Sequence, residues 1–517
     1  MKITQINTTD LLGGAARASF RLFLGLDKIG EDSNFLTFER SSKNPKVTEV
    51  KVDNKMINST LDRRYKAIQK YYINNNRTEV SNTKFTFGYP GYEIYNHPLI
   101  QTSEIINLHW VEEFQSTITL HHLFETGKQF VWTLHDERPL TGGYHYSAGC
   151  MQHVLFSREC DLLVNDPYEL GYRNLLDKAE LFQNANITIV SPSKWLAEEA
   201  RKSFLFRDKE VLVIPNSLET DIFYPLDKKE AKRRMKMNPN SLALLFACEN
   251  ANEKRKGFEK LIEAMKILTK DPEINILIKK RQLELILMGI PNEDIETLDI
   301  KYNVTGVIND DNKMREIMSA ADIFVLPSLE DNLPNMMLES MACGTCVVGF
   351  ETGGVIDVVE NNTNGLIVEK GNSSALANSI KKLILDYKLR NEFNNKSSEL
   401  ISNNFNLEIQ ANRYLSLYNK INKKTDNNKS KHFLVSNDVS KINYEVGMNL
   451  SENLDKISIM ALEALLADQD YALDNLNMVL HKIRSNPLYR VGKKIKSLIK
   501  KYGFIFGETK SQIKKKG

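Results

Sequence analysis

One segment, residues 327–354, combines the residue types that could hold a phosphorylated sugar. An apolar run ends at Pro327, an acidic loop follows, and Pro334 stands where a short helix can begin. The free N–H groups and the dipole at such a helix start favour a phosphate. Asp331 on the loop and Glu339 inside the helix can each accept two hydroxyl hydrogen bonds. The alternative is that these acids only lie near a helix N-terminus and bind no ligand.

This segment resembles the acidic signature of the retaining nucleotide-sugar glycosyltransferases of family 4, which have the GT-B fold. The signature is an acid, seven residues and then Glu, and Asp331 and Glu339 fall on its two acidic positions. The first acid is usually Glu in that family, so Asp331 has a shorter reach. The resemblance implies that Asp331 lies beside the donor sugar and that Glu339 binds the nucleotide ribose. It covers about residues 1–420.

A basic cluster and a glycine turn complete the predicted donor side. Arg255 and Lys256 follow an apolar run and precede an amphipathic helix, so they could neutralise a departing diphosphate. Lys256 matches the family's lysine, and Arg255 is a substitute for its arginine. A solvated charge run is the alternative. We expect backbone N–H groups of Thr352, Gly353 and Gly354 to face the donor, and Ile308 to line the base pocket.

The first half of the chain offers a histidine and a glycine turn. His135 ends an apolar strand in a stretch, TLHD followed by TGG and HY, that resembles a polysaccharide-assembly subgroup of these transferases. The resemblance implies that the His135 ring contacts the donor sugar and that its backbone carbonyl meets developing positive charge. Gly13 and Gly14 follow the first strand and are donor-loop candidates. His109 and Arg17 are assigned to the acceptor side.

We expect no cofactor, because the nucleotide sugar is a substrate, and no metal, because no DxD motif lies in a suitable loop. The subgroup often has Cys where Tyr144 stands, with further cysteines downstream, and only Cys150 and Cys160 suggest them here. The five cysteines show no disulfide spacing, which is typical of a reducing compartment. Cys343 and Cys346 form a CxxC that closes a helix rather than opening one, so we interpret them as buried packing residues.

Alternating apolar runs and helical patterns predict an α/β protein with two Rossmann-like domains facing across a cleft, and a helical C-terminal extension. The predicted domains are 1–216 on the acceptor side and 217–421 on the nucleotide-sugar side, whose final helix returns to the first domain. A linker (422–447) and a helical extension with a basic tail (448–517) follow. The predicted strands are 2–7, 105–108, 130–134, 187–190, 211–214, 242–247, 283–288, 322–326, 346–349 and 365–368.

Charge is uneven along the 517 residues, although the formal net charge is only +3. From Lys482 to the end there are twelve Lys and Arg and one acid, Glu508, so the rest of the chain is mildly acidic. This amphipathic tail could contact an anionic membrane, with a solvated tail as the alternative. The helix predicted over 452–484 could self-associate. No apolar run reaches a membrane-spanning length, so we expect a cytoplasmic protein, with peripheral membrane contact left open.

The resemblance implies a retaining, metal-independent hexosyltransferase that moves a sugar from a nucleotide-sugar donor to a glycan or lipid-linked glycan in bacterial-type surface polysaccharide synthesis, and the acids and cations above agree with it. A protein or a small molecule as acceptor stays open. A Rossmann oxidoreductase is the alternative class, and it requires a GxGxxG with a later acid that we do not find. A nucleic-acid partner is not expected, because no reader motif accompanies the basic tail.

Overall fold

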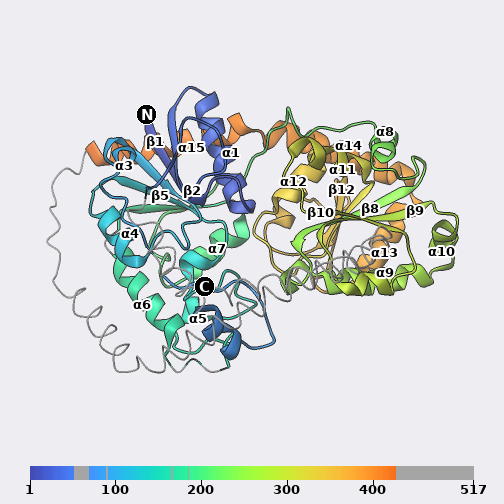
Figure 1. The fold of residues 1–517 in the computed structure, drawn as a ribbon, viewed down its shortest axis with the longest axis horizontal. Coiled ribbons are helices and arrows are strands. Elements are labelled where there is room, and N and C mark those ends of the chain that lie inside the picture. The colour runs from blue at the N-terminus through green and yellow to red at the C-terminus, as the bar shows by residue number, and fades with distance from the viewer. Residues whose placement is uncertain (52–68, 89–90, 165, 167, 184, 427–517) are drawn as a thin grey trace, which may run out of the picture. The chain divides into compact units, whose positions relative to one another are not determined.

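Two parallel β-sheets organise the chain, each between layers of helices (Figure 1). The computed structural model describes residues 1–51, 69–88, 91–164, 166, 168–183 and 185–426. The elements below belong to one compact unit. The predictions made for the 427–517 stretch, including the 452–484 helix and the basic tail, lie outside the described residues.

The first lobe is built on a seven-stranded sheet with the strand order β3-β2-β1-β4-β5-β6-β7. Every pair is parallel, so each connection must cross over the sheet. The strands are β1 (Lys2–Thr9), β2 (Asp32–Glu39), β3 (Val47–Glu49), β4 (Ile105–Leu108), β5 (Gln129–Thr133), β6 (Ile187–Ser191) and β7 (Val211–Val213). The helices are α1 (Gly14–Lys28), α3 (Pro98–Thr102), α4 (Thr117–Phe124), α5 (Gln152–Leu155), α6 (Leu170–Gln183) and α7 (Lys194–Lys202).

The second lobe repeats the plan with a six-stranded parallel sheet of order β10-β9-β8-β11-β12-β13. Its strands are β8 (Leu242–Asn250), β9 (Leu283–Ile290), β10 (Tyr302–Gly306), β11 (Ile323–Leu326), β12 (Cys346–Phe350) and β13 (Gly365–Val368). Its helices are α8 (Lys228–Arg234), α9 (Phe258–Lys270), α10 (Pro272–Lys279), α11 (Asp311–Ala320), α12 (Asn335–Ala342), α13 (Ser373–Leu385) and α14 (Tyr387–Asn404).

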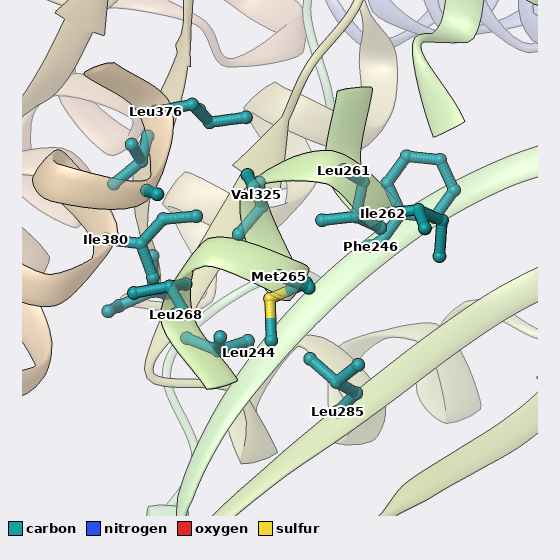
Figure 2. Close-up of a cluster of buried hydrophobic side chains, with 14 of the residues drawn as sticks. Leu244, Phe246, Leu261, Ile262, Met265, Leu268, Leu285, Val325, Leu376 and Ile380 are labelled. Atoms are coloured by element: carbon teal, nitrogen blue, oxygen red, sulfur yellow. The ribbon is translucent and has the colours of Figure 1, made fainter. Parts of the chain in front are cut away.

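Within each lobe, apolar side chains on both faces of the sheet pack against the helices that cover it. In the second lobe, Leu244 and Phe246 of β8 meet Leu261 and Met265 of α9, with Ile380 of α13 in the same cluster (Figure 2). A separate cluster packs α8, α11 and α12 against the opposite face. Because strands buried on both faces are continuous apolar runs, their positions could be predicted from sequence.

The final described helix, α15 (Leu407–Asp426), packs against α1 of the first lobe. Tyr414 and Tyr418 of α15 are buried, and their hydroxyls lie 3.0 Å from Thr133 Oγ1 and Asn107 Nδ2. The helix runs to Asp426, so it enters the stretch predicted as a linker, and its packing against the first lobe extends to Ile421.

The chain passes from one lobe to the other twice, and the two connecting segments lie beside each other. The backbone N–H of Leu218 donates to the carbonyl of Phe405 at 2.9 Å. Gln410 Nε2 of α15 donates to the Pro215 carbonyl at 2.9 Å, and Ser217 Oγ donates to Gln410 Oε1 at 2.6 Å. The segment 215–218, where the chain first passes between the lobes, is therefore hydrogen-bonded to the return crossing.

Candidate active site

The loops that could bind a ligand follow the central strands of both sheets. In each sheet the strand order reverses beside its first strand, between β1 and β4 and between β8 and β11. Open parallel sheets bind ligands beyond the carboxyl ends of strands at such switch points. The loops after these strands carry Gly13, Lys256 and Asp331, and His135 follows the neighbouring β5.

A cavity of about 510 Å³ lies at these loops and is lined by residues of both lobes. This volume lies within the range of small-molecule sites, roughly 300–1,000 Å³. The predicted residues that line it are Gly13, Gly14, His135, Arg255, Lys256 and Asp331. The predicted residues that do not line it are Arg17, His109, Ile308, Glu339, Thr352, Gly353 and Gly354.

Two cations and a carboxylate gather on the second-lobe wall of the cavity. Lys256 Nζ lies 2.6 Å from Asp331 Oδ2, and Arg255 Nη1 lies 3.7 Å from the same oxygen. Arg255 also pairs with Glu253 at 2.6 Å and stacks over the Tyr146 ring at 4.1 Å. Burial opposes the charge of Asp331, but Lys256 and Arg255 hold its pKa below the usual range. Asp331 is therefore an anion fixed between cations.

Two helix N-termini face the same cavity. Gly13 precedes α1 with φ +93°, and Pro334 precedes α12, so Pro334 is the N-cap rather than the first helical residue as predicted. The side chain of Asn335 donates to the Gly14 carbonyl at 2.8 Å, which ties the two helix starts together. The first N–H groups of a helix lack intrahelical acceptors and attract anions. A diphosphate could therefore meet both helix starts and the cations.

His135 reaches the cavity from the first lobe with a second histidine behind it. His135 Nε2 lies 2.9 Å from His109 Nδ1, and His109 Nε2 lies 2.8 Å from Gln5 Oε1. Burial lowers the pKa of His135 to about 4, against the opposing effect of Asp136. Burial, then the charge of His135, lowers the pKa of His109 well below its usual range. Both rings are neutral near pH 7. His109 lies behind His135 and does not line the cavity, so it is not placed to contact an acceptor as predicted.

Glu339 is buried against arginines of α1 instead of facing the cavity. Arg21 Nη2 lies 2.7 Å from Glu339 Oε1, and Arg21 Nε lies 2.8 Å from Glu219 Oε2. Burial disfavours the Arg21 charge, but Glu339 and Glu219 raise its pKa above the ordinary value. Arg17 Nη2 lies 2.5 Å from Asp311 and 3.6 Å from Glu339. Arg17 is thus committed to the second lobe rather than to an acceptor.

The Thr352 to Gly354 turn braces the acidic loop instead of presenting donors to the cavity. The Gly354 N–H donates to the Asn332 carbonyl at 2.6 Å, and Thr352 Oγ1 donates to the Leu329 carbonyl at 2.9 Å. Gly353 has φ +47°, and a Cβ there would stand 1.6 Å from the Asp331 carbonyl oxygen. Only glycine fits this approach. The prediction that Gly354 offers a free N–H is therefore wrong.

Ile308 follows β10 and packs against the second-lobe core, in the cluster that includes Met288. It does not line the cavity. Its assignment to a base pocket therefore stays a prediction. Cys343 and Cys346 are buried, and burial raises the pKa of each to about 12. Their interpretation as packing residues is confirmed.

Sequence reasoning missed Asn332, which connects the lobes at the site. Its side-chain amide donates to the His135 carbonyl at 3.2 Å, and its amide oxygen accepts from Ser193 Oγ at 2.6 Å. The His135 carbonyl therefore has a donor, and one lone pair remains for a ligand. Arg21 was also missed, although it lies one helical turn after Arg17 and so on the same face of α1. That spacing was the available signal.

The two parallel sheets and the cavity between them define a GT-B protein, with two Rossmann-like lobes. Solved structures confirm the fold. Sucrose-phosphate synthase from Thermosynechococcus elongatus aligns with TM-score 0.54 and 18% identity, over 82% of this chain and 99% of that chain. HepE from Anabaena, in complex with UDP-glucose, aligns with TM-score 0.54 and 15% identity, over 81% of this chain and 99% of that chain.

Sequence comparisons support a glycosyltransferase. Residues 229–400 match the family model described as Glycosyl transferases group 1. The capsular polysaccharide glycosyltransferase CapM of Staphylococcus aureus is 26% identical over 49% of this chain and 66% of CapM. The lipopolysaccharide core glycosyltransferase LpsE of Rhizobium meliloti is 29% identical over 46% of this chain and 65% of LpsE. The chain thus spans about two thirds of the length of these relatives. Assignment to family 4 stays a prediction.

In the part of the chain that the structure describes, no helix combines the length and apolarity needed to cross a bilayer.

Proposed function

We propose that this chain is a retaining glycosyltransferase that moves a sugar from a nucleotide-sugar donor to a glycan or a lipid-linked glycan. One observation carries the proposal. The Lys256, Arg255 and Asp331 group of one lobe and the neutral His135 of the other line a single cavity between two helix starts. The crystallised complex of HepE with UDP-glucose supports a nucleotide-sugar donor of this type.

The cations and the helix starts hold the donor diphosphate. Its charge grows as the glycosidic bond breaks, and Lys256 and Arg255 are fixed where they can stabilise that charge. In the structure described here Lys256 pairs with Asp331 at 2.6 Å. A bound diphosphate shares Lys256 with Asp331, because an ammonium group has three donors.

Asp331 and His135 orient the transferred sugar. The carboxylate accepts sugar hydroxyls, and the neutral imidazole exchanges a hydrogen bond without adding charge. The acceptor hydroxyl attacks from the face that the leaving group occupies, and the departing phosphate takes its proton. The sugar C1–O bond to phosphate breaks as the C1–O bond to the acceptor forms, with the anomeric configuration retained. This scheme uses positioning and electrostatics, without a metal or a cofactor.

Glu339 is proposed to accept a ribose hydroxyl after a local change. Its Oε2 is buried without a hydrogen-bond partner among the described residues, so one acceptor is available. Glu339 is 1% exposed, so the ribose reaches it only when the neighbouring Arg17 turns away.

The relatives CapM and LpsE are named for capsular polysaccharide and lipopolysaccharide synthesis, which supports surface-polysaccharide acceptors for this chain. Peripheral contact with an anionic membrane and a cytoplasmic location remain part of the proposal. A protein or small-molecule acceptor is the alternative, and product analysis distinguishes them.

The first experiment is a screen of UDP-, GDP- and dTDP-sugars for nucleotide release by the purified chain, followed by NMR of the product's anomeric configuration. Inversion of configuration, or no donor turned over with any glycan acceptor, contradicts the proposal.

The second experiment compares Lys256→Met with Lys254→Met. Lys254 is exposed, bonds to the Glu79 carbonyl and does not line the cavity. We expect Lys256→Met to lower kcat/KM by about 10²–10³, the usual cost of an electrostatic group at a developing charge, and Lys254→Met to leave it unchanged. Equal turnover in the two variants would rule out the charge-stabilising role.

A further inference from the structure

Two buried side chains and one half-buried side chain outside the cavity converge on one point in the first lobe. Glu137 follows β5, His153 lies in α5 and Glu199 lies in α7. Each offers one ligand atom, and these atoms all lie within 4.8 Å of one another. None of the three residues lines the cavity described above.

Two of these atoms lack any hydrogen-bond partner in the part of the chain that the structure describes. They are Glu137 Oε1 and His153 Nε2, on residues that are 0% and 1% exposed. Glu199 Oε2 is 3.6 Å from His153 Nε2, which is too long for a hydrogen bond. Leaving such groups unpaired in the interior costs about 1–3 kcal/mol each, and more for a charge. Both orphan atoms belong to the same cluster, so one occupant could satisfy both.

The opposite atom of each side chain is already held. His153 Nδ1 lies 3.1 Å from the Tyr144 hydroxyl, and Glu137 Oε2 accepts the Ser147 N–H at 2.5 Å. Glu199 Oε1 accepts from Lys202 Nζ at 3.0 Å. Such outer contacts are the ones that orient metal ligands, with a bond at one imidazole nitrogen leaving the other free to coordinate.

We propose that Glu137, His153 and Glu199 bind a divalent transition-metal ion, with zinc as the occupant. Two carboxylates and a dication sum to zero charge, which suits a buried position. An imidazole ligand favours zinc over magnesium or calcium, which prefer oxygen alone.

The ion has a structural role. It joins the loop after β5, which also carries His135 and Tyr146 of the cavity, to α7. The N-cap of α7 is Ser193, which donates to Asn332 of the second lobe. The sequence pattern did not indicate this site, because metal binding was weighed on cysteines and a DxD motif, whereas these ligands are two glutamates and a histidine. The proposed sugar-transfer step does not use this ion.

The test measures zinc in the full-length protein purified without chelator, by elemental mass spectrometry, and then titrates zinc into chelator-treated protein while following thermal unfolding. We expect about one zinc per chain and a Tm that rises with zinc. Glu199→Gln is the ligand variant and Glu198→Gln the control, because Glu198 is the exposed neighbour on the same helix.

Glu199→Gln should weaken zinc binding by at least about tenfold and flatten the Tm response, whereas Glu198→Gln should match the wild type. His153→Gln should behave as Glu199→Gln does, with circular dichroism confirming that each variant is folded. Zinc that is absent from the wild type and leaves its Tm unchanged on titration overturns the proposal. Equal zinc affinity in Glu199→Gln and the wild type also overturns it, because the ion then binds elsewhere.

Discussion

The ion pair between Arg21 and Glu339 should be the strongest single polar tie between α1 and α12. Both side chains are 1% exposed and 2.7 Å apart, and Glu219 on the other side of Arg21 is 14% exposed. Arg21→Met leaves the buried Glu339 carboxylate with only the longer 3.6 Å contact to Arg17, and breaking a buried pair in this way typically costs about 3–5 kcal/mol. Glu219 contributes less to this loss because water can still reach it.

A double-mutant cycle separates this effect from lost packing. Arg21→Met combined with Glu339→Met replaces the pair by apolar side chains, and such replacement is often neutral. We therefore expect the double variant to be more stable than Arg21→Met alone, with a coupling energy of at least about 2 kcal/mol. The control is Arg17→Met, one turn earlier and 22% exposed, which should cost no more than about 1 kcal/mol.

The assay is urea unfolding followed by tryptophan fluorescence. All three tryptophans, Trp110, Trp132 and Trp195, lie in the first lobe, so their signal reports the lobe that contains α1. Because a two-lobed protein need not unfold in one step, the first-lobe midpoint is compared between variants. The reasoning is refuted if Arg21→Met costs no more than Arg17→Met, or if the two methionine substitutions are simply additive.

Four further outcomes follow from the site. Asp331→Asn, which removes the anion between the cations, should lower kcat/KM by about 10- to 100-fold and raise the KM for the donor, in steady-state assays; an unchanged rate contradicts its role. His135 loses its neutral form only as the pH falls through about 4, so the acid limb of kcat/KM should lie there and not near 6.5. The unfolded chain gains that proton at higher pH, so the same histidine should cost about 3 kcal/mol of stability between pH 6.5 and 4, measured by urea unfolding. Gly353→Ala should lower the Tm far more than Gly371→Ala, because both have positive φ and only Gly353 has a carbonyl within 1.6 Å of the new Cβ.

The sequence predicted the buried strands of both sheets because each is a continuous apolar run. It missed β2, β3 and β10, which lie at or next to sheet edges. β2 mixes polar and apolar residues, β3 has three residues, and β10 is half-exposed. Such strands form because they pair with a neighbouring strand, and the local sequence does not reveal which segment that neighbour is.

The site was predictable where residues directly follow a strand. His135 was found in this way, because strand ends in parallel sheets face a ligand crevice. Asp331, Lys256 and Arg255 were found from the acidic and basic patterns of the loops that follow β11 and β8. The partners that fix them were not predictable. Asn332 bonds to the carbonyl of His135, 197 residues earlier in the chain, and no local spacing encodes that contact.

The acidic loop, which carries Asp331, is held in one conformation by contacts from both lobes. Gly353 packs on the Asp331 carbonyl and Gly354 donates to the Asn332 carbonyl, so the loop backbone is fixed from the second lobe. The Asn332 side chain also donates to the His135 carbonyl, which ties the loop to the first lobe. Asp331 therefore holds Lys256 in place before any donor arrives, and little reorganisation remains when the leaving phosphate gains charge. Loosening this loop should reduce kcat even where every charged side chain is intact, because preorganisation is the larger part of such stabilisation.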